Sequence, residues 1–255
     1  MLLDASTVSG LFNSFQDCHV LVVGDLMLDR FVDGNVTRIS PEAPVPVLSQ
    51  SRCQQMPGGA ANVACNLAQL GAQVTLIGAC GDDTAASDLA TELRNFPNIT
   101  FLPIPIYGRQ TSVKTRYRAT GQQILRVDDE VTSDIDSGAQ QTLCETVNSV
   151  IASANMLVLS DYAKGCLPEK VVRQLISAAK AAKKLIAVDP KVTDLSVYAD
   201  VDILTPNLQE LSISAGTSLA ELETIGATAT RLAKTHNIGT IVTTLSARGI
   251  LASSA

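Results

Sequence analysis

Strand-length apolar runs alternate with helical segments along most of this 255-residue chain. The apolar runs lie at residues 19–23, 74–77, 156–159, 185–188, 202–204 and 240–244. Helices are expected between them, over about residues 58–71, 84–94, 134–152 and 219–235, with two more beginning near Pro168 and Asn207. Continuous apolar strands joined through helices are typical of a parallel sheet covered on both faces. The sequence therefore predicts a mostly parallel α/β fold.

Composition narrows the class of protein. With 46% hydrophobic and 17% charged residues, the chain can bury a sizeable core, and one domain over residues 1–255 is expected. The net charge of −6 and the lack of a Lys/Arg cluster argue against nucleic acid or an anionic membrane as partner. No apolar run approaches 18 residues, and the six cysteines have no CxxC spacing, so a cytoplasmic protein with reduced thiols is expected.

The segment GGAANVACNLAQLG, residues 58–71, combines adjacent glycines with a helix of small residues. Gly58 and Gly59 let the backbone approach a ligand closely, and Asn62 and Asn66 share one face of the helix. The first turn of such a helix offers free N–H groups to a polyhydroxyl or anionic ligand. A tightly packed helix after an ordinary turn remains the alternative interpretation.

Polar residues follow four of the expected strands. They are Gly24-Asp25 with Asp29, Ser160-Asp161, Asp189-Pro190-Lys191 and Thr205-Pro206-Asn207. Ligands of open α/β sheets bind beyond the carboxyl ends of the strands, and carboxylate and amide oxygens suit magnesium. This edge is therefore expected to handle hydroxyls, phosphates and a divalent cation, although Asp25 as a helix cap and Asp189 as a turn residue remain open.

Two segments are expected to leave the core as a small β lid. Residues 31–52 contain Pro41, Pro44 and Pro46 around short alternating stretches, and residues 99–128 contain a hairpin across Gly121. The hairpin carries basic residues at strand period, which places them on one face: Lys114, Arg116, Arg118 and Arg126. They form either an anion site or a solvated face.

Two common phosphate-binding motifs are missing, namely G-x-x-x-x-G-K-[ST] and a G-x-G-x-x-G after the first strand. Instead, a set of segments in fixed order resembles the ribokinase-like (PfkB) sugar kinases, most narrowly the heptose 7-phosphate kinase domain of the bifunctional heptose kinase/adenylyltransferases. The segments are VVGDLMLDRF, TRISPEAPVPV, PGGAANVACNLAQLG, LSDYAKG, VDPK and TPNLQE. The resemblance covers residues 20–249.

The resemblance implies a three-layer α/β/α fold with a β lid that serves as a homodimer clasp. It implies transfer of the ATP γ-phosphoryl group, with Mg²⁺, to the anomeric hydroxyl of D-glycero-β-D-manno-heptose 7-phosphate in lipopolysaccharide core synthesis. The implied sugar-phosphate ligands are Asp29, Gly58, Gly59, Asn62, Asn66, Lys114 and Arg116. The implied nucleotide ligands are Lys164, Asp189, Lys191, Asn207, Leu208, Gln209, Glu210 and Thr244, with Glu210 also serving the metal.

The sequence departs from the family pattern in two places. Ser246 stands where a glycine is usual in the nucleotide loop after Thr244. The family's D-T-x-G-A-G-D segment, which carries the catalytic base, is not found before Ala255. We therefore expect a C-terminally truncated domain whose 255 residues alone turn over negligibly. A non-catalytic sugar-phosphate-binding protein and a kinase of another sugar or nucleoside are the competing hypotheses.

Overall fold

The structure, a computed structural model, describes residues 4–255, whose strands form one sheet of eight strands and one of four. The larger sheet contains β1 (His19–Gly24), β4 (Gln73–Gly81), β5 (Ile99–Ile106), β8 (Met156–Ser160), β9 (Leu185–Asp189), β10 (Ile203–Leu204), β11 (Thr240–Thr244) and β12 (Ile250–Ser254). Its strand order is β12-β11-β10-β9-β8-β1-β4-β5, and only β12 runs antiparallel to its neighbour. The mostly parallel sheet predicted from sequence is confirmed.

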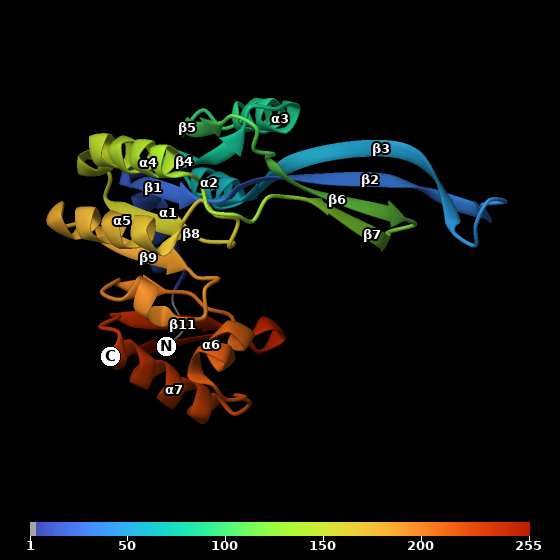
Figure 1. Cartoon of the computed structure of the whole chain (residues 1–255). Coiled ribbons are helices and arrows are strands. Elements are labelled where there is room, and N and C mark those ends of the chain that lie inside the picture. The colour runs from blue at the N-terminus through green and yellow to red at the C-terminus, as the bar shows by residue number, and fades with distance from the viewer. Residues whose placement is uncertain (1–3) are drawn as a thin grey trace.

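Helices cover both faces of the larger sheet (Figure 1). Leu21 and Val23 of β1 belong to the core under α4 (Ser137–Val150) and α5 (Glu169–Ala181). The intervening Val20 and Val22 belong to the core under α2 (Ala60–Gln69) and α3 (Thr84–Leu93). Alternate residues of one buried strand therefore pack against opposite helical layers, which gives three layers.

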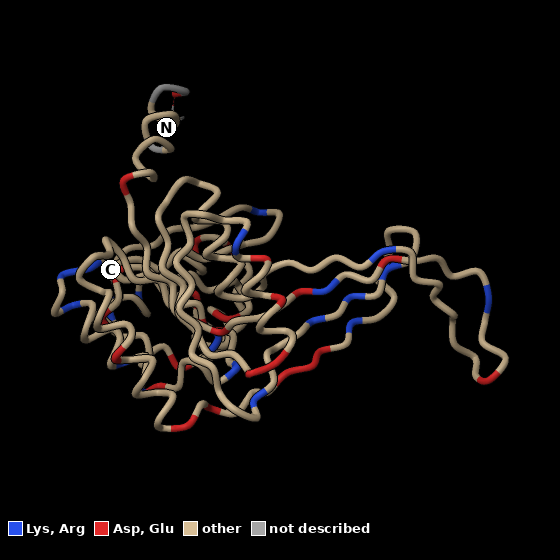
Figure 2. Tube along the Cα trace, turned by 90° about the horizontal axis from the view of Figure 1, so that it is seen from above, with Lys and Arg blue, Asp and Glu red and all other residues tan. Residues whose placement is uncertain are grey.

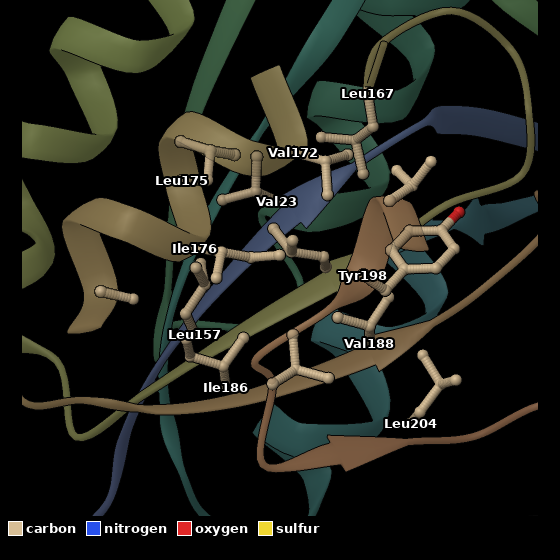
Figure 3. Packing of buried hydrophobic residues seen from close by; sticks show 14 of the residues in the cluster. Val23, Leu157, Leu167, Val172, Leu175, Ile176, Ile186, Val188, Tyr198 and Leu204 are labelled. Atoms are coloured by element: carbon tan, nitrogen blue, oxygen red, sulfur yellow. The ribbon is translucent and has the colours of Figure 1, made fainter. Parts of the chain in front are cut away.

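The close packing of the first of these layers is shown in Figure 3, where Val172, Leu175 and Ile176 of α5 lie over strand side chains such as Leu157 and Ile186. The remaining helices are α1 (Ala5–Ser14), α6 (Leu208–Ala215) and α7 (Leu222–Thr235), with 3-10 turns at Phe15–Asp17, Ile151–Ser153, Leu195–Tyr198 and Ser246–Arg248. No helix within residues 4–255 combines the length and apolar character needed to cross a membrane.

The second sheet, which we call the lid, projects from the body of the molecule (Figures 1 and 2). Its strands are β2 (Leu26–Ile39), β3 (Pro46–Gly59), β6 (Ser112–Ala119) and β7 (Gln122–Asp129), in the order β3-β2-β6-β7. The two predicted segments do come together, and the hairpin across Gly121 is confirmed.

The predicted lid bounds need correction. Residues 99–106 form β5, which pairs with β4 at the edge of the larger sheet, so this part of the chain belongs to the body. Pro103 and Pro105 are compatible with this position, because an edge strand is paired on only one of its sides. The other segment is longer than predicted, since β2 begins at Leu26 and β3 ends at Gly59.

Three local predictions also differ from the structure. Pro168 is the N-cap of α5 and not its first helical residue. Asp25 precedes strand β2, so the alternative that it caps a following helix is wrong. The antiparallel β12, with the sequence ILASS, was not predicted.

Candidate active site

The polar strand ends do lie together at one edge of the sheet. In the strand registers Gly24 pairs with Ser160, and Ser160 pairs with Asp189, so β1, β8 and β9 end level with one another. An isolated parallel bridge between Asn207 and Thr244 extends this edge to β11. The recurrence of polar residues after successive strands therefore corresponds to one continuous surface.

Asp25 organises the loop that follows β8. Its Oδ2 accepts hydrogen bonds from the backbone N–H groups of Tyr162 at 2.8 Å and Lys164 at 3.1 Å, and its Oδ1 accepts one from Cys166 at 3.0 Å. The side chain is buried, and burial raises its pKa even though the three N–H groups favour the charged form. Asp25 thus shapes the segment 161–166, which we call the 161–166 loop.

The glycine pair seats the start of α2 against the end of β1. Gly59 is the N-cap with φ +56°, and a Cβ at this position would lie 2.4 Å from the carbonyl oxygen of Asp25. That carbonyl accepts the N–H of Ala60 at 3.0 Å. A Cβ at Gly58 would lie 2.8 Å from Oδ2 of Asp29. The two glycines therefore permit two different close approaches, one to backbone and one to the Asp29 carboxylate.

The other residues expected to bind the sugar phosphate lie on α2 and on the lid. Asn62 and Asn66 are exposed on α2. Asp29 of β2 lies beside Lys114 in the parallel β2–β6 register, and its Oδ1 is 2.5 Å from Nη1 of Arg116. The structure thus brings Asp29, Gly58, Lys114 and Arg116 together, as the resemblance implied.

Lys164 lies beside the residues expected to bind the sugar phosphate. Its Nζ is 2.6 Å from Oε1 of Glu130, whose Oε2 is 2.8 Å from Nζ of Lys114. The assignment of Lys164 to the nucleotide finds no support in these contacts. Glu130 was missed from the sequence, because the last of three consecutive acids at the end of a hairpin gives no sign of its distant partners.

The basic face of the lid is largely paired with acids. Arg118 donates to both carboxylate oxygens of Asp33, at 2.7 and 2.9 Å, and this hydrogen-bonded pair lowers the pKa of Asp33. The guanidinium carbons of Arg116 and Arg118 lie 5.3 and 4.6 Å from the centre of the Phe31 ring. Figure 2 shows basic and acidic residues distributed together over the lid strands.

A cavity of about 530 Å³ opens beside this region on the α2 face of the sheet. Its apolar lining includes Val158 and Ala187 from the sheet and Val63 from α2. Its polar lining is Asp161, Tyr162, Asp189, Lys191, Thr205, Asn207, Glu210 and Thr244. Five predicted nucleotide ligands therefore share one cavity. Leu208 and Gln209 line an adjoining cavity of about 550 Å³ together with Ser246.

Glu210 and Asp189 give this cavity a paired acidic character. Burial, reinforced by the charge of Glu210, raises the pKa of Asp189 to about 6. Oε2 of Glu210 accepts the N–H of Asn207 at 3.0 Å in a capping box that starts α6, and Oε1 is 2.9 Å from Nζ of Lys191. No group of three or more metal-ligating side chains occurs within residues 4–255. Two carboxylates nevertheless fit Mg²⁺, which takes its other ligands from water and phosphates.

Tyr162 connects the two halves of the site. It lines the cavity, while its backbone N–H is held by Asp25. Burial raises the pKa of its hydroxyl, and the charges of Asp189 and Asp29 raise it further. Tyr162 thus joins the cavity to the end of β1, a connection that the sequence motif LSDYAKG did not reveal.

Comparisons with known proteins agree with this arrangement. The model of the "pfkB family carbohydrate kinase" matches residues 18–255. "Bifunctional protein HldE" of Acidiphilium cryptum is 40% identical over 232 residues, 91% of this chain and 48% of that protein. The protein of the same name from Azorhizobium caulinodans is 44% identical over 198 residues, 77% of this chain and 41% of that protein. The chain thus spans about half the length of these relatives.

Solved structures show the same fold. The phosphofructokinase-2 of Escherichia coli in complex with substrates and products superposes with a TM-score of 0.76 over 93% of this chain and 76% of that chain, at 22% identity. Arabidopsis thaliana ribokinase complexed with ribose and ATP gives a TM-score of 0.66 over 93% of this chain and 74% of that chain, at 19% identity. Family model, relatives and fold agree, and the chain belongs to the pfkB family of carbohydrate kinases.

Proposed function

We propose that this chain carries the acceptor and nucleotide sites of a kinase that phosphorylates D-glycero-β-D-manno-heptose 7-phosphate at its anomeric hydroxyl. The observation that carries the proposal is the 161–166 loop, in which Tyr162 lines the cavity with Asp189 and Glu210 while Nζ of Lys164 contacts Glu130, the partner of Lys114 on the lid. A phosphoryl transfer enzyme needs its two substrates held on either side of a short path, because positioning and electrostatics supply most of its catalysis.

On the acceptor side, Asp29 binds sugar hydroxyls. The close approach of Gly58 to this carboxylate leaves room for a sugar where a side chain would otherwise stand. Gly59 fixes the start of α2, from which the exposed Asn62 and Asn66 offer amide groups to the same sugar. Lys114 and Arg116 hold the substrate's 7-phosphate from the lid, where charge-assisted hydrogen bonds to phosphate are strong.

On the nucleotide side, ATP occupies the cavity at the ends of β9 to β11. Asn207 and Glu210 hold Mg²⁺ and the phosphates, with Asp189 as the second carboxylate beside them and Lys191 as a counter-charge. Leu208, Gln209 and Thr244 line the adjoining space. The bound ATP–Mg²⁺ supplies the phosphoryl group, and the residues of the chain bind and orient it. Glu210 keeps its carboxylate fixed through the capping box, so its orientation is set before the nucleotide binds.

We further propose that two copies of the chain associate through their lids. β3 and β7 are the outer strands of the lid, and an unpaired strand edge is prone to pair with another chain. Ile124, Leu125 and Val127 of β7 are exposed apolar residues in that region. Sedimentation of the chain and of a Leu125→Lys variant tests this: the variant is expected to be a monomer, and an unchanged dimer would contradict the proposed interface.

The chemical proposal is tested by following the conversion of heptose 7-phosphate to heptose 1,7-bisphosphate by ³¹P NMR in the presence of ATP–Mg²⁺. Because the segment D-T-x-G-A-G-D is not found in this sequence, the chain is assayed both alone and within a longer protein that carries such a segment. Bisphosphate formed by the longer protein supports the proposal. Phosphorylation of a different sugar in preference to the heptose would contradict the assigned substrate.

A further inference from the structure

Glu130 joins the lid to the 161–166 loop through two ammonium groups. Its two carboxylate oxygens contact Nζ of Lys114 at 2.8 Å and Nζ of Lys164 at 2.6 Å. All three side chains are mostly buried yet accessible, with exposed fractions of 16 to 20%. Two lysines from distant parts of the chain thus converge on one anionic group between the lid and the 161–166 loop.

The position of Lys164 is fixed by its backbone. Its N–H donates to Oδ2 of Asp25 at 3.1 Å, and its carbonyl accepts a hydrogen bond of 2.5 Å from the guanidinium of Arg109. Arg109 also donates to the carbonyls of Val131 and Ser133, which follow Glu130 in the chain. The same guanidinium therefore holds the backbone of Lys164 and the segment after Glu130. The Glu130–Lys164 pair is thus preorganised by Arg109.

The charges around this pair are otherwise balanced. Arg116 is engaged by Asp29, and Asp128 contacts both Lys114 and Arg126. Burial opposes ionisation of Glu130, but hydrogen bonds from Lys114 and Lys164 outweigh it and lower its pKa, so the group is an anion at neutral pH. Lys164 has no acidic partner other than Glu130 among the salt bridges of residues 4–255.

We propose that Lys164 joins Lys114 and Arg116 in the subsite for the phosphate group of the sugar-phosphate acceptor, and that Glu130 occupies this subsite in the free protein as an internal competitor. The inference rests on the proposed function and deepens it, by adding Lys164 to the acceptor and giving Glu130 a role in specificity. A phosphate dianion satisfies both ammonium groups better than one carboxylate, because it carries more charge and more acceptor oxygens. A neutral sugar cannot displace Glu130 from the two lysines. The contact of Glu130 with Lys114 and Lys164 therefore selects phosphorylated acceptors.

The test is calorimetric titration of the chain and its variants with heptose 7-phosphate and, separately, with the unphosphorylated heptose. Glu130→Gln keeps the shape and an acceptor oxygen but removes the competing charge, so affinity for heptose 7-phosphate is expected to rise by about threefold to tenfold. Lys164→Met keeps the aliphatic stem and is expected to weaken the same binding by about tenfold or more. Neither change is expected to alter binding of the unphosphorylated sugar.

Asp129→Asn is the matched control. It removes the same charge one residue away, from an exposed side chain that lines a separate depression beside β6, so it reports any general effect of net charge on anion binding. Its affinity for heptose 7-phosphate is expected to stay within about twofold of the parent chain. An increase equal to that of Glu130→Gln would overturn the inference.

The outcomes also separate this inference from the proposed function. If heptose 7-phosphate binds the parent chain but Glu130→Gln weakens that binding or leaves it unchanged, Glu130 is a structural link between lid and loop and the inference is wrong. If Lys164→Met retains full affinity, the phosphate is held elsewhere. If the parent chain binds ATP–Mg²⁺ but no heptose 7-phosphate, the assigned acceptor fails and the inference fails with it.

Discussion

Oδ2 of Asp25 lies 2.8 Å from the backbone nitrogen of Tyr162, a residue 137 positions further along the chain. Through this contact the end of β1 fixes the loop that lies between the two halves of the site. The bond belongs to a set of three N–H donors that Asp25 satisfies. Its consequence is that the order of the 161–166 loop depends on a residue that touches neither proposed substrate.

Replacing Asp25 by Ala is expected to destabilise the fold strongly. The change leaves three buried or half-buried N–H groups without their acceptor, at a cost of about 3 kcal/mol or more in free energy of unfolding. Urea denaturation measures this. Asp25→Asn, which keeps one acceptor oxygen, is expected to lose less. A change below about 1 kcal/mol for Asp25→Ala would contradict the account of the loop.

Gly58 and Gly59 are expected to respond differently to substitution by Ala. At Gly59 the Cβ meets a backbone carbonyl at 2.4 Å and φ is +56°, so Gly59→Ala should lower stability by about 1–3 kcal/mol. At Gly58 the atom nearest to the Cβ belongs to the side-chain carboxylate of Asp29 and not to the backbone, so Gly58→Ala should lower stability by less than about 1 kcal/mol while weakening sugar-phosphate binding. Thermal unfolding and calorimetry of both variants separate the two effects, and equal losses of stability would argue against this distinction.

Glu210→Gln is expected to separate metal binding from helix capping. Glutamine at N3 can maintain the capping box, so the thermal midpoint should change little. Loss of the charge should weaken ATP–Mg²⁺ binding by about tenfold or more, while heptose 7-phosphate binding stays unchanged. The matched variant Asn207→Ala removes the cap and should cost about 1 kcal/mol of stability. Full nucleotide affinity in Glu210→Gln would exclude Glu210 from the metal site.

The pKa of Asp189, raised to about 6, predicts opposite pH trends for stability and for nucleotide binding. The folded chain holds this proton more tightly than the unfolded chain, so this group's contribution to the free energy of unfolding falls as the pH rises from about 4 to 6. Ionisation grows from about one tenth at pH 5 to about nine tenths at pH 7, so ATP–Mg²⁺ should bind more tightly over that interval. Calorimetry from pH 5 to 8 tests this, and Asp189→Asn should flatten the profile.

Ser246 offers a test of the departure from the family pattern. It has φ +55°, a conformation in which glycine has no steric penalty, and this explains why glycine is usual at this point of the nucleotide loop. Ser246→Gly is therefore expected to raise the free energy of unfolding by up to about 1 kcal/mol. Ser218→Gly, at an exposed position without positive φ, is the control and should not stabilise the chain.

Much of the sheet could be predicted because its signal is local. A run such as HVLVV shows burial on both faces, and a polar residue such as Asp189 directly after a strand is placed at the edge by the strand direction alone. Residues 99–106 were assigned to the wrong sheet because a pattern of strands separated by turns predicts strands without saying which sheet each one joins. β12 was not predicted, and its antiparallel pairing with β11 departs from the parallel pattern of the preceding strands.

The site was less predictable because its contacts join distant segments. Neither the three N–H donors to Asp25 nor the convergence of Lys114 and Lys164 on Glu130 leaves a periodic pattern in the sequence. Motif resemblance proposed ligands at the strand ends and assigned Lys164 to the nucleotide, whereas the contact of Lys164 with Glu130 is a fact of the structure. The structure supplied Glu130, Tyr162 and the supporting role of Asp25.

The central claim is that one edge of this chain holds a sugar phosphate and ATP–Mg²⁺ in two separate half-sites. Titration of the chain with heptose 7-phosphate, with and without a non-hydrolysable ATP analogue and Mg²⁺, tests it most directly when repeated on Asp29→Asn and Glu210→Gln. Both ligands are expected to bind the parent chain, with Asp29→Asn losing only the sugar phosphate and Glu210→Gln only the nucleotide. Binding of the sugar phosphate without any nucleotide binding would contradict the claim and favour a non-catalytic sugar-phosphate-binding protein.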